Sequence, residues 1–577
     1  MLAVFTVFGL YNLFTVFKLQ ILQYNDLSAR SEQRIKRKET LVPRRGLIYD
    51  TRGQLLAGNA TAYDVYVDLT HRKKDAQLHE IADLLAPALN ENPQTLFARF
   101  REMLDQEVNY VKVANRVDLS MRDKVKELAA RYDDVLKPVV NFEIQSLRHY
   151  PNTTPAGAGG LAASVIGFTD YDNVGHYGVE EFYNAKLAGE AGWIDAERDA
   201  YGNPLVLQQP EMQPAIDGSD VVLTIDSAIQ YMVERELKAS LDEFKADFGY
   251  AIVQDPNTGA ILAMASYPTF DPNKFNEVTN YELFKNPAVT DVREPGSTMK
   301  ILTYASAIDA GAVTSATSMY GTSYVVKYGV PLYNATRTEW GWQTMAQGLG
   351  RSDNVAAIFA AEMLGPDKYY EYMKNFGIGT RTGIDLAGEV AGLVSWPDSD
   401  GYSPVDFYTM AFGQSAAMTP LQLVNSVSAV ANGGTLLKPY VMKEIRKGDE
   451  VVATGQRQEV RRVIDPATTR DIADMLANGV ENGMVARFSA VPGYHVSVKT
   501  GTADVASDGG YNGITFASAM GFAPSHDPRF TLYIGIMHPR TSPWGENTTS
   551  VSWGRLAKEL LLYMKVQPTG PLPTATP

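Results

Sequence analysis

The chain has 577 residues, which is too long for one compact core when domains hold roughly 100–200 residues each, so two or more folded units are expected. Its formal net charge of −14 argues against a nucleic-acid binder, because such a protein needs a basic face to neutralise phosphates. The chain has no cysteine and its seven histidines form no H-E-x-x-H pair, so cysteine nucleophiles are excluded and neither a metal nor another cofactor is expected.

A transmembrane anchor is predicted at residues 1–24. The first 17 residues carry no charge, and a helix of about 20 residues that extends past a snorkelling Lys18 would span the hydrocarbon layer. No small-residue cleavage site follows, so a retained anchor is favoured over a removed signal peptide. Basic residues follow this segment between Arg30 and Lys38 and none precedes it. Taken literally, the positive-inside rule would then leave the bulk of the protein in the cytoplasm.

Residues 25–215 are predicted to form one region of mixed structure. Residues 25–40 are polar and basic and are expected to be helical. The runs "GLIY" and "QLLA", separated by Asp50 to Gly53, predict a hairpin, and residues 75–137 are expected to be mostly helical because apolar side chains recur with a helical period. Residues 139–205 are rich in glycine and indicate loops with short strands. The polar stretch "QPEMQPAIDGSD" marks the end of this region.

A second unit is predicted at residues 216–565. It begins with a strand in "VVLTID", an amphipathic helix in "SAIQYMVERELKASLDEF" and a hairpin in "GYAIVQDPNTGAILAMASY". Near its end, "VSVKTGTADV", "TFASAMGFAP" and "RFTLYIGIM" read as strands, and "WGRLAKELLLYM" as a last helix. Strands at both ends with helices between them predict a sheet assembled from distant pieces, in an α+β multidomain chain. The proline-rich tail at 566–577 is predicted to be disordered.

The stretch "VREPGSTMK" allows two interpretations of Ser297. After Pro295 and Gly296, a serine is a favoured cap for the first turn of the helix that the following apolar spacing predicts, and Lys300 would then be merely solvated. For a four-residue pattern alone, this is the stronger interpretation. The alternative is that Ser297 is a nucleophile.

Two further motifs favour the nucleophile. S-x-x-K occurs once, at Ser297 to Lys300, and is followed by one S-D-N at Ser352 to Asn354 and one K-T-G at Lys499 to Gly501, all in the second unit. A serine needs a base to take its proton, and residues three apart on a helix share a face. A lysine acts as a base only when its pKa is lowered, which burial and a second cation would do. The N–H of a residue at a helix start also favours an oxyanion.

With these motifs the chain resembles a class B penicillin-binding protein, a monofunctional peptidoglycan D,D-transpeptidase, over almost its full length. Outside the three motifs the resemblance includes "RRGLIYDTRGQLLAGN", "GHYGVEEFYNAKLAGEAG", "TPLQLVNSVSAVANGG" and "FASAMGFAP". It implies an extended pedestal with a dimerisation-like fold at 25–215. At 216–565 it implies a β-lactamase-like transpeptidase domain with a five-stranded antiparallel sheet flanked by helices. A transpeptidase of this kind works outside the cytoplasm, so we expect that a short basic tail upstream of Met1 is missing from this sequence.

The resemblance also implies catalytic roles. Ser297 would attack the carbonyl between the two terminal D-alanines of a stem peptide, and Lys300 would be its general base. Ser352 would pass a proton to the leaving amine with the support of Lys499, and Asn354 would hold the peptide's amide. β-Lactams would acylate the same serine.

The K-T-G-T strand would bind substrate. By the same resemblance, Thr500 and Thr502 would hold the terminal carboxylate next to Gly501, and the backbone N–H groups of Ser297 and Thr502 would form the oxyanion hole.

The sequence departs from the family pattern at four positions. Val498 and Ser415 replace common glycines, and Ala519 and Met520 fill positions that are often aromatic or β-branched. We expect these changes to affect strand packing and drug affinity more than catalysis.

Two rival functions remain open at this point. A β-lactamase would need a deacylating glutamate, for which Glu389 is the candidate, although its context "AGEVAGLVSWP" favours a structural role. A β-lactam sensor or a scaffold for wall-building partners is the non-enzymatic alternative, and the intact motif set argues against it. Within the family, Glu294 in "REPGSTMK" favours the division type over the elongation type. Either type would work with a membrane-embedded glycosyltransferase among divisome or elongasome proteins.

Overall fold

The computed structural model describes residues 2–24, 36–154, 159–197, 211–507 and 510–570. By internal contacts the chain divides into two compact units. One joins Met1–Gly46 to Ala185–Ser219, and the other joins Leu47–Asn184 to Asp220–Pro577. The second unit carries all the predicted site residues.

The first unit contains the apolar N-terminal helix. Helix α1 (Leu2–Phe17) continues as a π-helical turn (Lys18–Leu22), and the segment Phe5–Leu22 is long and apolar enough to cross a membrane. A candidate membrane span therefore lies where the anchor is predicted.

A three-stranded sheet in the same unit corrects one prediction. β1 (Lys36–Leu41) pairs antiparallel with β8 (Gly192–Glu197), which pairs with β9 (Glu211–Gln213). A helix over residues 25–40 is therefore wrong for residues 36–40, and residues 25–35 lie outside the described residues. The partner of Lys36 is Glu197, far along the chain, so no local pattern indicates this strand.

The second unit contains a seven-stranded sheet in the order β21-β20-β10-β2-β3-β4, with β5 paired to β3. Its strands are β2 (Ile48–Tyr49), β3 (Leu55–Asp68), β4 (Tyr110–Val117), β5 (Val140–His149), β10 (Asp220–Leu223), β20 (Met442–Lys447) and β21 (Glu450–Thr454). β2 and β3 form the predicted hairpin. Asp50 fixes its turn, because its Oδ1 accepts from the backbone N–H of Arg52 and of Gln54, both at 2.8 Å.

Three helices pack with this sheet, namely α3 (Asp75–Leu85), α4 (Pro93–Asp105) and α5 (Leu119–Arg131). The mostly helical region predicted at residues 75–137 is confirmed for these three, but the prediction missed β4. In β4, Val111 and Val113 are buried and Lys112 between them is exposed. This alternation is typical of a strand, but it covers too few residues to be recognised in the sequence.

Residues 159–187 form two short strands, as predicted, and three short helices, which the prediction of loops and short strands missed. These are α6 (Ala163–Ile166), β6 (Phe168–Thr169), β7 (Gly175–His176), α7 (Gly178–Phe182) and α8 (Asn184–Leu187).

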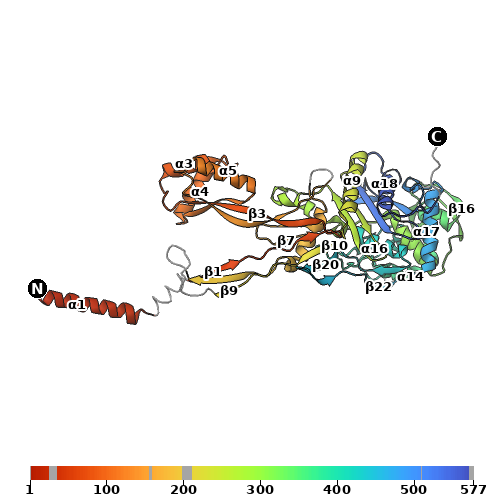
Figure 1. The fold of residues 1–577 in the computed structure, drawn as a ribbon. Helices are drawn as coiled ribbons and strands as arrows, with labels where there is room; N and C mark the ends of the chain where they lie inside the picture. Colours follow the sequence, from red (N-terminus) through yellow and green to blue (C-terminus); the bar gives the residue numbers. More distant parts are fainter. Residues whose placement is uncertain (1, 25–35, 155–158, 198–210, 508–509, 571–577) are drawn as a thin grey trace. The chain divides into compact units, whose positions relative to one another are not determined.

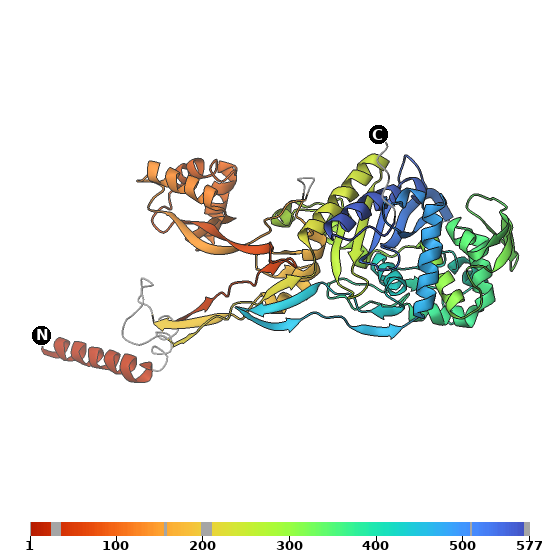
Figure 2. The ribbon, with the colours of Figure 1, turned by 45° about the vertical axis from the view of Figure 1, so that its right-hand side comes forward.

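The predicted five-stranded antiparallel sheet is confirmed, in the order β12-β11-β25-β24-β23. Its strands are β11 (Phe248–Gln254), β12 (Ile261–Tyr267), β23 (Ser497–Ser507), β24 (Gly510–Ala523) and β25 (Phe530–Met537). Helices α9 (Ser227–Phe244) and α18 (Thr549–Tyr563) lie side by side in Figures 1 and 2 and share one apolar core with the sheet. Helix α16 (Pro420–Ala431) contacts the other face, where Gln254 accepts from Ser428 Oγ at 2.8 Å.

The chain between the two halves of this sheet carries two of the three motifs, S-x-x-K and S-D-N, whereas K-T-G lies on β23 of the sheet itself. Beyond 3-10 turns and short strands, the elements of this connecting chain are α11 (Lys300–Asp309), β13 (Ser318–Gly321), β14 (Tyr324–Lys327), β15 (Val330–Tyr333), β16 (Gly341–Thr344), α12 (Met345–Gly350), α13 (Asn354–Leu364), α14 (Pro366–Asn375), α15 (Pro404–Met410) and α17 (Pro466–Glu481). β13 pairs with β16, and β14 pairs with β15. Figure 1 places β16 and α17 in the same region of the second unit.

Helix α9 contains a buried carboxyl group. Glu234 Oε1 accepts from the backbone N–H of Ala162 (2.8 Å) and from Gln230 Nε2 (2.9 Å), while Oε2 is buried without a partner among the described residues. Burial raises the pKa of Glu234 to about 7, and the two hydrogen bonds oppose this rise only in part.

Stability of the chain is therefore expected to fall as pH rises from about 4.5 through about 7, because over this window the folded chain keeps the Glu234 proton that the unfolded chain releases. The loss from this group is about 3 kcal/mol. The side chain of Glu234→Gln cannot ionise. The apparent melting temperature of this variant, relative to that of the wild type, should therefore increase as pH rises from about 5 to about 8. Glu371→Gln, at an exposed residue of α14, is the matched control. Identical pH profiles for the wild type and Glu234→Gln would contradict the assignment.

Candidate active site

Ser297 lies at a helix start, as predicted, but it is not the cap. Gly296–Met299 form a 3-10 turn that leads into α11, and no backbone N–H of this turn bonds to the Ser297 side chain. Instead, the Oγ of Ser297 accepts from Lys300 Nζ at 3.0 Å. The capping interpretation is therefore wrong, and the hydroxyl is left in contact with the lysine.

Lys300 is completely buried at the centre of the site. Besides Ser297, its Nζ donates to the backbone oxygen of Ser352 (2.7 Å) and to Asn354 Oδ1 (2.6 Å). Burial lowers the pKa of Lys300 to about 7, while the negative charge of Asp353 works in the opposite direction. A neutral amine is therefore accessible near neutral pH, directly beside the serine hydroxyl.

Lys499, from β23, approaches from the sheet. Its Nζ donates to Ser352 Oγ (2.8 Å) and to the backbone oxygen of Thr500 (2.9 Å). Burial and then repulsion by Lys300 lower the pKa of Lys499 well below its ordinary value. Since Lys300 Nζ also lies 3.3 Å from Ser352 Oγ, the hydroxyl of Ser352 connects the two lysines.

The turn between α12 and α13 presents Ser352 and Asn354. Ser352 has a positive φ of 59°, a backbone conformation uncommon for a non-glycine residue. Asp353 caps α13 by accepting from the N–H groups of Val355 and Ala356. Asn354 Nδ2 donates to the backbone oxygen of Tyr333 (2.8 Å), so both ends of its amide are engaged.

A cavity of about 230 Å³ opens over these residues. Its lining includes Ser297, Ser352, Thr500, Thr502, Trp340 and Trp544. Gly501 lies in the same strand, where a Cβ would come within 2.5 Å of Ser518 Oγ. The structure thus brings together all eight residues predicted for the site, namely Ser297, Lys300, Ser352, Asn354, Lys499, Thr500, Gly501 and Thr502.

Comparison with known families agrees with this geometry. Residues 249–561 match the penicillin-binding protein transpeptidase domain, and residues 40–223 match the penicillin-binding protein dimerisation domain. The chain belongs to the class B penicillin-binding proteins.

Named relatives share most of the length of this penicillin-binding protein. It is 32% identical to stage V sporulation protein D of Bacillus subtilis, over 95% of this chain and 83% of that protein. It is 28% identical to peptidoglycan D,D-transpeptidase FtsI of Escherichia coli, over 95% of this chain and 89% of that protein. The crystal structure of penicillin-binding protein 3 from Mycobacterium tuberculosis, complexed with aztreonam, superposes with a TM-score of 0.69 at 25% identity. That match covers 92% of this chain and 99% of the other.

The departures from the family pattern occupy defined positions in this penicillin-binding protein. Val498 and Ala519 are buried in the core that α9 and α18 share with the sheet, and Met520 is also buried. Ser415 has a φ of +58°, a region that glycine enters freely. The backbone N–H of Ser415 donates to Glu294 Oε1 at 2.8 Å, which ties its loop to the segment before Ser297.

Glu389, the candidate deacylating residue of a β-lactamase, is held by its own loop. Its carboxylate accepts from the N–H and the hydroxyl of Thr382, both at 2.6 Å, and from the N–H of Gly383 at 3.0 Å. It is not among the residues that line the cavity around Ser297. These contacts favour the structural role.

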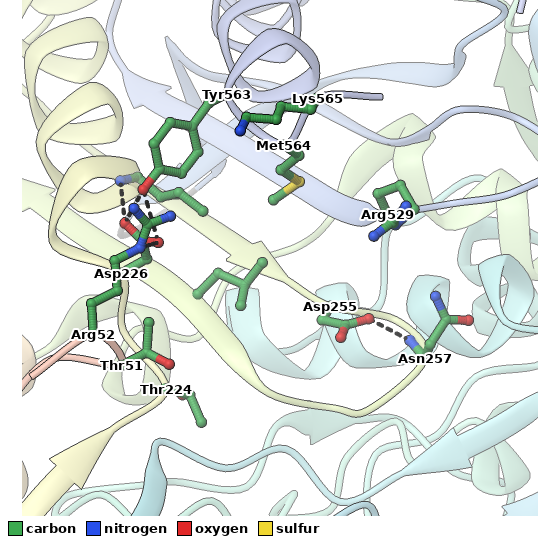
Figure 3. A pocket seen from close by; sticks show the side chains of 12 residues that line it. Thr51, Arg52, Thr224, Asp226, Asp255, Asn257, Arg529, Tyr563, Met564 and Lys565 are labelled. Atoms are coloured by element: carbon green, nitrogen blue, oxygen red, sulfur yellow. Dashed lines mark hydrogen bonds and ion pairs between the residues drawn. The ribbon is translucent and has the colours of Figure 1, made fainter. Parts of the chain in front are cut away.

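A larger cavity of about 640 Å³ lies away from the motifs. Figure 3 shows its side chains, among them Arg52, Asp226 and Tyr563. The guanidinium of Arg52 pairs with Asp226 at 3.0 Å, and the Tyr563 hydroxyl donates to the same carboxylate. None of the predicted site residues lines this cavity, so its size does not make it the active site.

Sequence reasoning missed the close approach of Gly413 to Gly296. The N–H of Gly296 donates to the Gly413 oxygen (3.1 Å), and a Cβ on Gly413 would lie 1.9 Å from the Gly296 oxygen. Gly413 also has a φ of +95°. Only glycine fits there, and the contact holds the turn that contains Ser297.

Gly413→Ala should therefore slow acylation by a labelled penicillin about a hundredfold, because displacing Gly296 by about 1 Å moves the serine hydroxyl from its partner. Gly401→Ala is the matched control, since Gly401 has a φ of +82° but nothing within 4 Å of its added Cβ. Acylation rates would be compared after circular dichroism shows that both variants are folded. Equal rates for the two variants would contradict the role of this contact.

Proposed function

We propose that this penicillin-binding protein crosslinks peptidoglycan stem peptides through an acyl-enzyme on Ser297. The observation that carries the proposal is the contact of 3.0 Å between the Ser297 hydroxyl and a buried lysine whose pKa is lowered to about 7. An ordinary surface lysine would be protonated at neutral pH and could not take the serine proton.

In the acylation step, Lys300 Nζ takes the proton of Ser297 while Oγ attacks the carbonyl carbon between the two terminal D-alanines. The N–H groups of Ser297 and Thr502 stabilise the resulting oxyanion. When the carbon–nitrogen bond breaks, the leaving D-alanine nitrogen receives a proton through Ser352, which lies between Lys300 and Lys499. A stem-peptide amine then attacks the ester, gives up a proton by the same route and restores the Ser297 hydroxyl.

The remaining site residues orient the donor peptide. Thr500 and Thr502 line the cavity and offer hydroxyl groups to the terminal carboxylate. Gly501 between them lets the strand pack closely on the protein, since a Cβ there would meet Ser518 Oγ at 2.5 Å and the Pro295 oxygen at 3.1 Å. Asn354 Nδ2 carries two hydrogens, of which one is used by the Tyr333 oxygen, so the other is available to the peptide's carbonyl.

Inhibition by β-lactams follows from the same chemistry, since a β-lactam presents a strained amide where the peptide presents its D-alanyl-D-alanine end. The structural similarity to a penicillin-binding protein 3 complexed with aztreonam supports this part of the proposal. A β-lactamase would hydrolyse the acyl-enzyme quickly, but Glu389, the candidate for that step, is held by Thr382 and Gly383 and does not line the cavity.

The cellular setting is proposed from the anchor and from one residue of the motif. The span Phe5–Leu22 would hold the protein in the cell membrane as a single pass, with the transpeptidase domain outside the cytoplasm. Glu294 before "PGS" favours the division type. A membrane-embedded glycosyltransferase would supply the glycan strands, and a tagged copy at midcell rather than along the sidewall would support the division role.

Ser297→Ala is expected to abolish covalent labelling by fluorescent penicillin, with a loss of at least about a thousandfold in acylation rate, because among the hydroxyls that line the cavity Ser297 is the one at the helix start and 3.0 Å from Lys300 Nζ. Ser120→Ala, an exposed serine of α5, should label like the wild type. In the wild type the label should persist for hours. Rapid loss of label with release of hydrolysed penicillin would instead indicate a β-lactamase.

The acylation rate should rise about tenfold per pH unit below about pH 7 and level off above it, because Lys300 must be neutral to act as the base. Asp353→Asn should move this inflection to lower pH, since the carboxylate of Asp353 favours the charged lysine. Rates would be measured with the wild type and Asp353→Asn between about pH 5.5 and about pH 8.5. A flat profile in the wild type would argue against Lys300 as the base.

A further inference from the structure

Two cross-strand aromatic pairs lie on the hairpins that follow α11. Tyr320 of β13 stands opposite Trp342 of β16, with ring centroids 5.8 Å apart in an edge-to-face arrangement. Tyr324 of β14 stands opposite Tyr333 of β15, with centroids 5.4 Å apart. We call these four rings the hairpin aromatic surface.

This surface faces solvent while the opposite side of the hairpins is buried. Trp342 is 75% exposed and Tyr320 is 48% exposed, whereas Met319 and Gln343, their neighbours in the two strands, are buried. With three quarters of its area in water, the indole of Trp342 has an open ring face. Exposed aromatic groups gathered in this way mark an interaction site more often than chance.

The loop that joins β15 to β16 links the hairpin aromatic surface to the active-site cavity along the chain. This loop lines the cavity through Asn334, Thr336 and Trp340, and Trp340 precedes Trp342 by two residues. Hydrogen bonds fix the loop to the S-D-N turn. The backbone N–H of Asn354 donates to Asn334 Oδ1 (2.9 Å), and Asn354 Nδ2 donates to the Tyr333 oxygen (2.8 Å).

The size of the cavity indicates what must lie outside it. About 230 Å³ is less than the roughly 300–1,000 Å³ of a typical ligand pocket, so only the end of a stem peptide fits. Because Asn354 is proposed to hold the donor's amide, the rest of the donor leaves the cavity beside Tyr333 and the hairpins. A stem peptide of a few residues reaches only about 10–15 Å, which brings the glycan to which it is attached onto this surface.

The chemistry of the surface fits a sugar. A pyranose ring has an apolar face of C–H groups and an edge of hydroxyl groups, so it binds best to an aromatic face that has polar groups at its rim. The Tyr320 hydroxyl donates to Glu339 Oε1 at 2.7 Å, and Thr336 and Thr338 lie in the same loop.

We propose that the hairpin aromatic surface binds the glycan strand that carries the donor stem peptide, with Trp342 and Tyr320 as its stacking platform. This inference rests on the proposed transpeptidase function and adds a carbohydrate subsite outside the cavity. Binding energy gained there, away from the reacting carbonyl, positions the donor peptide for attack by Ser297.

The test compares two donors on the full-length protein in detergent, with a labelled D-amino acid as acceptor. One donor is a sugar-free stem peptide ending in D-alanyl-D-alanine, and the other is the same peptide on polymerised glycan. Trp342→Ala and Tyr320→Ala should lower kcat/KM for the glycan-borne donor about tenfold, chiefly through KM, and leave the sugar-free donor and penicillin acylation unchanged. Trp342→Phe should recover part of the loss. Tyr281→Ala, at an exposed tyrosine of another segment, is the control.

If Trp342→Ala and Tyr320→Ala lowered kcat/KM equally for both donors, the inference would be overturned, because the rings would then support the catalytic site itself. The inference would also be overturned if the variants transferred both donors as fast as the wild type. If the variants then lowered crosslinking only in cells, the surface would bind a protein partner instead of glycan. Failure of the proposed function looks different, since the wild type would then transfer neither donor. Calorimetry with peptide-free glycan strands still tests the surface in that case. Trp342→Ala should weaken this binding about tenfold, and unchanged binding would overturn the inference.

Discussion

The site depends on one buried amine that has to be accommodated without a matching buried carboxylate in contact with it. Lys300 is completely enclosed, and its Nζ donates to a serine hydroxyl, a backbone oxygen and an amide oxygen rather than to an acid. Neutral acceptors satisfy the hydrogens of an amine but compensate poorly for a full positive charge. The fold therefore favours the uncharged lysine. The 3-10 turn with Ser297 and the turn between α12 and α13 must both place their acceptor oxygens next to Lys300 Nζ.

A second lysine extends this constraint to the sheet. Lys499 and Lys300 reach the same hydroxyl, Ser352 Oγ, from different layers of the domain. Two ammonium groups so close and so poorly hydrated repel each other, so a proton held by one amine lowers the proton affinity of the other. The two lysines titrate as a pair, and Ser352 lies where a proton would pass between them.

The sequence was sufficient for the parts of the protein that local patterns determine. Alternating or continuous apolar runs predicted β11, β12, β23, β24 and β25. Three short motifs, with the threonine that follows the last of them, predicted the eight residues that the structure brings together. Strand β1 was missed because its partner lies far along the chain. The interpretation of Ser297 as a cap failed because its hydroxyl accepts from Lys300, three residues on, instead of from a backbone N–H, and Lys300 is held there by Ser352 and Asn354 from a distant part of the chain. The approach of Gly413 to Gly296, like the effect of Asp353 on Lys300, depends on distances that no spacing encodes.

The order of the five-stranded sheet has a consequence for how the protein is made. β11 pairs with β25, and the strand that carries Lys499 is added beyond β24, so the sheet closes only when residues close to the carboxyl end are present. Pairing between such distant segments is slow, and a chain still being synthesised lacks it altogether. Until β23 arrives, Ser352 Oγ has no contact with a second amine and the wall formed by Thr500 and Thr502 does not exist. A truncated or partly synthesised chain therefore lacks the contact between Lys499 and Ser352 and one wall of the cavity, so the site is assembled only at the end of synthesis.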